Sequence, residues 1–281
     1  MMVRREIYEH GVKILADAGI DEASLDAWIL FEEVTKVTRA DYYARSNAKV
    51  AEEEVEAYLS WISERAKRIP LQHILGYQEF MGLKFLVTPE VLIPRQDTEV
   101  LVEYVETIVR GNDKPMNILD MCTGSGCIIL SLLKRNKEVR GIGVDISPAA
   151  IGIAKKNAQN LGVKVDFLQS DLFDKVTDAY DVIVSNPPYI KENDIKSLDV
   201  EVRQFDPVLA LNGGADGLIF YRRIARESRE YLRQGGQLAL EIGYDQAKAV
   251  SGFMKDYGFE DIGVLKDLAG LDRIVYGVYN K

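Results

Sequence analysis

The chain has 281 residues, a length that corresponds to one large domain or two modest ones and can bury a core without disulfides or metal. Hydrophobic residues make up 47% and charged residues 28%, an ordinary globular composition that excludes collagen-like, disordered and coiled-coil proteins. The 35 basic and 44 acidic residues give a net charge of −9. Because this charge repels polyanions, we expect no direct binding to nucleic acid or to an anionic membrane.

The sequence contains two cysteines, Cys122 and Cys127, and two histidines, His10 and His73. Their spacing matches neither a zinc-ligand pattern nor a disulfide framework, so we expect no metal site and a reducing compartment. The first residues carry basic charge without an apolar stretch behind it, and no apolar run is long enough to span a membrane. We therefore expect a cytoplasmic protein.

The first part of the chain has helical periodicity. Apolar residues recur at helical spacing up to about Lys67, which predicts a small all-helical N-terminal domain over residues 1–74. Two short strand-like runs, 77–81 and 83–87, then flank Gly82 and predict a β-hairpin linker over residues 75–94.

The rest of the chain, residues 95–281, alternates between strand and helix patterns. The predicted strands cover 117–122, 139–144, 164–169, 181–185 and 237–242, and the predicted helices cover 126–135, 148–160 and 215–233. Buried strands that alternate with helices form βαβ units, so this pattern predicts an α/β fold with a parallel sheet. The last two strands, 259–264 and 273–279, have no helix between them and are predicted to pair antiparallel.

The first strand of this sheet runs into a glycine-containing loop. Ligands of open α/β sheets bind at the carboxyl ends of the strands, where glycine lets the backbone approach them closely. A dinucleotide site would need a third glycine three residues after Gly126, where Ile129 stands. The Asp-x-x-Thr-Gly-Ser-Gly spacing instead resembles the first motif of S-adenosylmethionine-dependent methyltransferases. The candidate cofactor residues in this loop are Asp120, Cys122, Thr123, Gly124, Ser125 and Gly126.

Acidic residues complete the candidate cofactor site. A carboxylate at Asp120 suits the cationic amino acid part of such a cofactor, and Asp145, at the end of the second strand, can accept hydrogen bonds from ribose hydroxyls. Asp171 and Leu172 follow the third strand and are placed to flank the adenine, although a turn or helix cap explains them equally well. The alternative for the glycine loop is a tight strand-to-helix turn without a ligand.

The fourth strand runs directly into Asn186, Pro187, Pro188 and Tyr189. Proline lacks an N–H donor, so this loop offers acceptors: the Asn186 side-chain oxygen and the Pro187 carbonyl. They match the two N–H groups of a planar –NH₂ group, against which Tyr189 can stack. Accepting both hydrogen bonds stabilises the positive charge that develops as the nitrogen attacks a methyl group. We therefore predict Asn186, Pro187 and Tyr189 as catalytic residues; the alternative is a rigid loop that only ends a buried strand.

Five further segments indicate which family of methyltransferases the chain resembles. They are Leu-Ile-Pro-Arg-Gln-Asp-Thr-Glu at 92–99, Phe-Asp-Pro at 205–207, Ala-Leu at 210–211, Gly-Gly-Ala-Asp-Gly at 213–217 and Glu-Ile-Gly-Tyr-Asp-Gln at 241–246. Together with the two loops they resemble the HemK/PrmC family of peptide chain release factor glutamine methyltransferases. The resemblance spans nearly the whole chain and is weakest over the first 65 residues.

The resemblance implies a Rossmann-like methyltransferase sheet and an enzyme that uses S-adenosylmethionine. It implies methylation of the glutamine side-chain amide in the Gly-Gly-Gln loop of class I release factors. By motif, residues 122–126, Asp145 and Asn186 would contact the cofactor, and residues 186–189 would hold the glutamine amide. The chain departs from the family at Cys122, where glycine is common, and at Leu172, where some members carry tryptophan.

The sequence leaves open the roles of two charged residues and three alternative functions. Arg95 and Glu99 are placed to border the substrate entrance, or else Asp97 or Thr98 caps a helix that begins near Glu99 and the charges are solvated. A DNA or RNA amino-methyltransferase would need a basic track that the sequence lacks. A ribosomal-protein glutamine methyltransferase would share the amide chemistry, and a release-factor-binding module could keep the cofactor fold without turnover.

Overall fold

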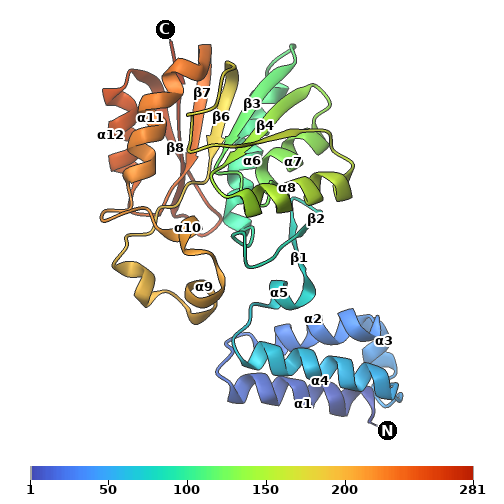
Figure 1. The fold of residues 1–281 in the computed structure, drawn as a ribbon. Helices are drawn as coiled ribbons and strands as arrows, with labels where there is room; N and C mark the ends of the chain where they lie inside the picture. The colour runs from blue at the N-terminus through green and yellow to red at the C-terminus, as the bar shows by residue number, and fades with distance from the viewer. Residues whose placement is uncertain (1, 281) are drawn as a thin grey trace. The chain divides into compact units, whose positions relative to one another are not determined.

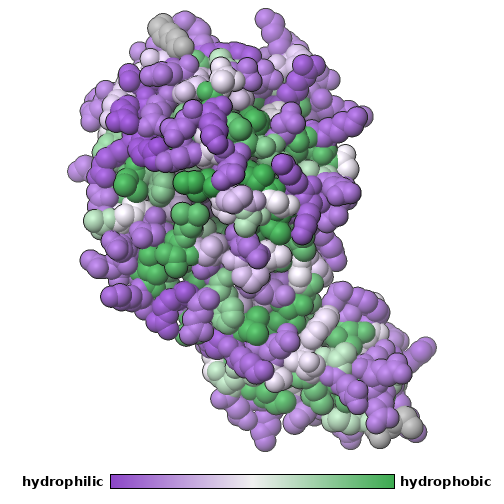
Figure 2. Space-filling model, in the orientation of Figure 1, coloured by the Kyte–Doolittle hydropathy of each residue, from purple (hydrophilic) through white to green (hydrophobic). Residues whose placement is uncertain are grey.

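The computed structural model describes residues 2–280 and divides into two compact units. The first unit holds the chain up to Gly76 together with Val200–Phe205, and the second holds Tyr77–Asp199 together with the chain from Asp206 onward. In both units hydrophilic side chains cover most of the face drawn in Figure 2, interrupted by separate apolar patches. None of the helices in residues 2–280 has the length and apolar character that crossing a membrane requires.

The first unit is all-helical. Its helices are α1 (Arg4–Asp17), α2 (Ala23–Thr35), α3 (Arg39–Ala44), α4 (Glu52–Ala66), α5 (Leu71–Leu75) and α9 (Val200–Phe205) (Figure 1). Trp28, Phe31 and Tyr42 meet in the core, where the Trp28 and Tyr42 ring centroids lie 5.3 Å apart, edge to face. Such aromatic pairs stabilise a core beyond the area that they bury.

A distant piece of the chain, α9, belongs to this helical unit through ion pairs. The Arg65 Nε donates to Asp26 Oδ2 at 2.7 Å, and its Nη1 donates to Glu201 Oε1 at 3.1 Å. Arg68 reaches the second oxygen of Glu201 at 2.8 Å. Arg65 and Asp26 are both buried. The helical periodicity of the first 67 residues could not reveal this partner, because ion pairs across 133 or more positions leave no local pattern.

The second unit is built on a mixed seven-stranded sheet with the strand order β5-β4-β3-β6-β7-β9-β8. Its strands are β3 (Met116–Met121), β4 (Val139–Asp145), β5 (Asp166–Gln169), β6 (Tyr180–Ser185), β7 (Leu232–Glu241), β8 (Phe259–Lys266) and β9 (Asp272–Tyr279). The first five are parallel, and β9 pairs antiparallel with both β7 and β8. The predicted parallel sheet and antiparallel last pair are confirmed.

Helices cover both faces of this sheet (Figure 1). They are α6 (Glu99–Arg110), α7 (Cys127–Arg135) and α8 (Pro148–Leu161) on one side and α11 (Ile219–Tyr231) and α12 (Ala247–Asp256) on the other. Successive strand residues point to opposite faces, so Ile118 packs with α6 and α7 while Leu119 packs with α11 and α12. Short helices α10 (Val208–Leu211), η1 (Gln96–Thr98) and η2 (Asp194–Ser197) lie in the connections.

The predicted hairpin consists of β1 (Tyr77–Phe80) and β2 (Leu83–Leu86). Phe80 and Phe85 are buried in the cluster beneath α6, so the hairpin belongs to the second unit. The Met81 backbone N–H at its turn donates to the Glu99 carboxylate at 2.5 Å.

Candidate functional site

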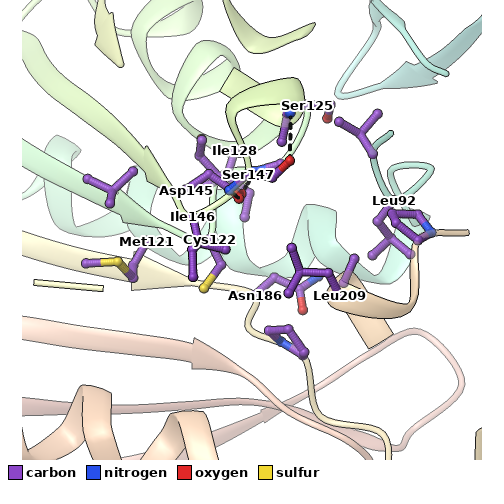
Figure 3. Close-up of a pocket in the computed structure, with 18 of the residues that line it drawn as sticks. Leu92, Met121, Cys122, Ser125, Ile128, Asp145, Ile146, Ser147, Asn186 and Leu209 are labelled. Atoms are coloured by element: carbon purple, nitrogen blue, oxygen red, sulfur yellow. Dashed lines mark hydrogen bonds between the residues drawn. The ribbon is translucent and has the colours of Figure 1, made fainter. Parts of the chain in front are cut away.

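The chain leaves β3 toward β4 on one side and later returns to β6 on its other side. Such a change of direction opens a crevice at the carboxyl ends of the strands. A cavity lies there, entirely within the second unit, lined by Leu92, Arg95, Thr98, Cys122–Ser125, Asp145, Ser147, Asp171, Leu172, Asn186, Pro188 and Leu209, among others. Figure 3 shows Asp145 and Ser147 on one side of Cys122 and Asn186 with Leu209 on the other.

The loop after β3 forms the floor of this cavity. The Thr123 N–H donates to the Val144 carbonyl at 2.9 Å, which ties the loop to the neighbouring strand. Gly126 has φ +81°, and a Cβ there would lie 3.0 Å from the Leu130 side chain. Glycine at this position therefore lets α7 begin close to the loop.

Asp145 presents a partly satisfied carboxylate to the cavity. Its Oδ2 accepts the Gly124 N–H and its Oδ1 accepts the Ser147 N–H, each at 2.9 Å. Burial raises the pKa of this carboxyl, while the two backbone hydrogen bonds favour its ionised form. Each oxygen can accept a further hydrogen bond, so this carboxylate can hold a vicinal diol such as that of a ribose.

Asp120 does not take the place that its sequence position suggested. It is fully buried and lies outside the cavity lining. Its Oδ2 accepts the Thr123 hydroxyl at 2.6 Å and the Ile129 N–H at 3.3 Å. Burial raises its pKa to about 7. The expectation of direct contact with a cationic group is thus replaced by a role in holding the loop against the start of α7.

Cys122 lines the cavity in a left-handed backbone conformation, with φ +60°. Residues with a Cβ avoid this region, and glycine does not. Burial raises the pKa of its thiol far above the usual range, so the thiol stays protonated.

Asp171 and Leu172 both line the cavity, as predicted for a region that would flank an adenine. Asp171 pairs with Arg223 of α11 at 2.9 Å, and Leu172 is buried with φ +46°. Together with Val144 and Ile146 the leucine gives this end of the cavity an apolar wall.

Asn186 lies at the opposite end, directly after β6. Its Nδ2 donates to the Thr98 hydroxyl at 3.3 Å, and both side chains lie beside the buried Glu241 carboxylate at the end of β7 and favour its ionised form. Because Thr98 uses the amide's donor end, its oxygen is left to accept hydrogen bonds in the cavity.

Pro187 and Tyr189 lie outside the cavity lining, whereas Pro188 belongs to it. Tyr189 packs its ring against the core, and its carbonyl accepts the Gln246 Nε2 at 3.0 Å. Gln246 also accepts the Gly243 N–H at 2.9 Å, so it connects the loop after β7 to the Asn-Pro-Pro-Tyr loop. The predicted stacking face is thus replaced by a ring that anchors the loop.

Arg95 and Glu99 separate in the structure. Arg95 lines the cavity and pairs with the buried Asp206 at 2.6 Å. Glu99 lies outside the lining and accepts the Met81 N–H of the hairpin turn. A border position at the entrance therefore fits Arg95, and Glu99 is a structural residue.

These features fit S-adenosylmethionine. The Asp145 carboxylate retains acceptors for a diol, the Leu172 end offers an apolar wall, and Asn186 lines the same cavity. With that cofactor bound, Asp145 would hold the ribose, Asp171 and Leu172 would flank the adenine, and the Cys122–Ser125 loop would lie along the remaining part.

Comparisons with known proteins identify the family. Residues 6–76 match the model of the PrmC N-terminal domain, and residues 96–205 match that of the methyltransferase small domain. The chain is 42% identical to the release factor glutamine methyltransferase of Geobacter sulfurreducens, over 94% of this chain and 92% of the relative. It is 40% identical to that of Clostridium botulinum, over 98% of each. The chain belongs to the release factor glutamine methyltransferase family.

A solved structure supports the fold. A methyltransferase from Pyrococcus furiosus, 15% identical, aligns with a TM-score of 0.53 over 78% of this chain and all of that one. The α/β sheet predicted from the alternation of strands and helices, and the Rossmann-like methyltransferase fold implied by the resemblance, are confirmed.

The backbone bears on the one position of this loop where the resemblance implied glycine. Cys122 has a left-handed φ, a conformation that glycine adopts more readily than residues with a Cβ. Sequence reasoning missed Thr98 and Glu241 as neighbours of Asn186. For Glu241, the strand order could have revealed the contact: Ser185 pairs with Leu240, so the residues that follow them, Asn186 and Glu241, are adjacent.

Proposed function

We propose that this member of the release factor glutamine methyltransferase family transfers a methyl group from S-adenosylmethionine to the side-chain amide nitrogen of a glutamine in a class I peptide chain release factor. The glutamine would be that of the Gly-Gly-Gln loop, and the reaction would take place in the cytoplasm, where release factors act. The helical N-terminal domain, residues 1–74, would bind the release factor, with 75–94 as linker and 95–281 as the methyltransferase domain.

The chemistry requires acceptors at the methyl-accepting nitrogen. When bound, the cofactor would supply an electrophilic methyl group on a sulfonium: the C–S bond breaks as the N–C bond forms, the sulfonium leaves as a neutral thioether, and the nitrogen releases one proton to solvent. An amide nitrogen is a weak nucleophile because its lone pair is delocalised into the carbonyl. The Asn186 oxygen and the Pro187 carbonyl would each accept one of its N–H bonds and stabilise the positive charge that develops there. Tyr189 and Gln246 would keep this loop in place.

The observation that carries the proposal is the occupied donor end of Asn186. With Nδ2 directed at Thr98, the side-chain oxygen is available at the cavity that also contains the Asp145 carboxylate. Holding nucleophile and methyl donor in line supplies about 7–11 kcal/mol of the activation barrier in well-oriented reactions.

The experiment incubates the protein and labelled S-adenosylmethionine separately with unmodified release factor, ribosomal protein and DNA. Peptide mass spectrometry then locates the label. We expect label on the release factor glutamine and none on a matched release factor in which that glutamine is replaced by glutamate. Label on DNA or ribosomal protein alone would contradict the proposal.

A further inference from the structure

Glu241 is a buried carboxylate that the proposed chemistry does not use directly. It ends β7, is 1% exposed and lies outside the cavity lining. Thr98 and Asn186 lie beside it and favour its ionised form, and its Oε2 has no hydrogen-bond partner within residues 2–280.

The parallel pairing of β6 and β7 fixes this arrangement. Ser185 is paired with Leu240, so Asn186 and Glu241 occupy the next position on each strand and point to the same side of the sheet. Thr98, on η1, completes the group, and its hydroxyl accepts the Asn186 Nδ2 at 3.3 Å. Two neighbouring strand ends and a third segment therefore bring these three side chains together in one polar network.

An ionised carboxylate can only accept hydrogen bonds. Beside it, the Thr98 hydroxyl is favoured with its proton toward Glu241 and its oxygen accepting from the Asn186 amide. The amide then directs its –NH₂ group inward and its oxygen toward the cavity. If Glu241 carries a proton, it can donate to Thr98, and the hydroxyl can donate to the amide oxygen instead. The amide would then present its –NH₂ group to the cavity, where it repels an incoming –NH₂ donor.

From this network we infer that Glu241 is a positioning residue whose ionised carboxylate, acting directly and through Thr98, holds the Asn186 oxygen toward the methyl-accepting nitrogen. The inference rests on the proposed role of Asn186. Glu241, the first residue of the Glu-Ile-Gly-Tyr-Asp-Gln segment at 241–246, would then orient a group that contacts the substrate.

The charged and titratable surroundings of Glu241 bear on its ionisation. Arg273 of β9 favours the ionised form, and Asp97 of η1 opposes it. Glu241 in turn interacts with Tyr189, Tyr221 and Cys127. Burial outweighs Arg273 and raises the pKa of Glu241 to about 7. The productive amide orientation is then complete above this pKa and is lost as the pH falls through it.

The test compares Glu241→Gln with Glu106→Gln. Glu106 is another buried carboxylate of the same unit, 3% exposed, which pairs with Arg110 and Arg135 on α6 and α7 and lies outside the cavity lining. Single-turnover methylation of unmodified release factor gives the rate from about pH 6 to about pH 9. A parallel titration gives the dissociation constant for S-adenosylmethionine.

We expect Glu241→Gln to lower the rate about tenfold or more, because a neutral amide at 241 no longer selects one orientation of Asn186. The affinity for S-adenosylmethionine should change less than about twofold. The wild-type rate should rise with pH around neutrality, and this rise should be absent in Glu241→Gln and kept in Glu106→Gln. Thr98→Val should lower the rate in the same direction, and Thr98→Ser should restore it.

A wild-type rate and pH profile in Glu241→Gln would overturn the inference. If Glu241→Gln fails to fold, the two Thr98 variants provide the test. A wild-type rate in Thr98→Val overturns the inference, whereas a lower rate in Thr98→Val together with a wild-type rate in Thr98→Ser supports it. Asn186→Ala separates the two proposals. Full turnover in that variant would overturn the role of Asn186 itself, whereas an inactive Asn186→Ala beside active Glu241→Gln and Thr98→Val would overturn only the positioning role.

Discussion

Cys122 has a side chain at a position where the backbone is left-handed, with φ +60°. This conformation costs residues other than glycine about 1–2 kcal/mol. We expect Cys122→Gly to change the free energy of unfolding by less than about 1 kcal/mol, because the strain relieved offsets the added backbone entropy of the unfolded chain. Cys122→Val should lose about 1–2 kcal/mol or more, since β-branching worsens the strain.

Urea denaturation measures both variants, with Cys122→Ala as the control that removes the thiol but keeps the Cβ. A Cys122→Val protein as stable as the wild type would contradict this account of the loop.

Asp120 provides a pH-dependent test of the same loop. Its pKa is raised to about 7 by burial, so the folded protein holds a proton that the unfolded chain releases above its ordinary, lower pKa. The folded state is therefore favoured at low pH, and this contribution is lost as the pH rises toward about 7. Asp120→Asn removes the titration. The stability of the variant relative to the wild type should rise between about pH 5 and about pH 8, measured by thermal unfolding. A constant difference across this range would show that Asp120 does not titrate with a raised pKa.

At the scale of elements, the Gly-Gly-Ala-Asp-Gly segment supports the Asn-Pro-Pro-Tyr loop. Gly213 donates its N–H to the Ile190 carbonyl at 2.8 Å. Gly217 has φ +74°, and a Cβ there would lie inside contact distance of the Tyr189 carbonyl oxygen. These glycines therefore allow a close approach between the two segments.

We expect Gly217→Ala to lower the free energy of unfolding by more than about 1 kcal/mol and to lower the methylation rate, because the Tyr189 carbonyl must move. Gly152→Ala, in the middle of α8 with no atom within 4 Å of the added Cβ, is the matched control and should be neutral or stabilising. Equal effects of the two variants on methylation would contradict the proposed contact.

The elements that the sequence predicted well are those with a strong local pattern. Strands β3, β4 and β6 agree with prediction to within about two residues, because each is a buried apolar run. Helix α12 was missed, although Ala247, Val250 and Met254 have helical spacing. Strand β7 begins at Leu232, whereas the prediction began it at 237. Its first half was not predicted because Gly235 and Gly236 interrupt the strand pattern in the sequence.

The candidate site was predictable in part for the same reason. That Asp145, the Cys122–Ser125 loop and Asn186 lie around one cavity could be predicted because they follow strands whose carboxyl ends meet at one edge. The inward orientation of Asp120, the separation of Arg95 from Glu99 and the contact of Thr98 and Glu241 with Asn186 depend on loop backbone angles and strand order, which no single segment encodes.

At the scale of the whole molecule, the helical unit is completed by a segment inserted between the Asn-Pro-Pro-Tyr loop and Asp206. The buried Arg65–Asp26 pair and the Arg65 and Arg68 contacts with Glu201 hold that segment. Removing one partner of a buried pair leaves an uncompensated charge.

We therefore expect Asp26→Ala to destabilise the helical unit by about 3–5 kcal/mol. Arg45→Ala, which removes an exposed pair with Asp41 at 3.7 Å, should change stability by about 0.5 kcal/mol or less. Chemical denaturation followed by Trp28 and Trp61 fluorescence measures both, since the chain's two tryptophans lie in the helical unit. Similar effects of the two substitutions would contradict the importance of the buried pair.

The most direct test of the account is the methylation rate of Asn186→Ala beside its affinity for S-adenosylmethionine. We predict that the rate on unmodified release factor falls at least about a hundredfold, because one acceptor of the amide is lost, while the dissociation constant stays within about threefold of the wild type. An Asn186→Ala protein that methylates the release factor glutamine at the wild-type rate would contradict the account.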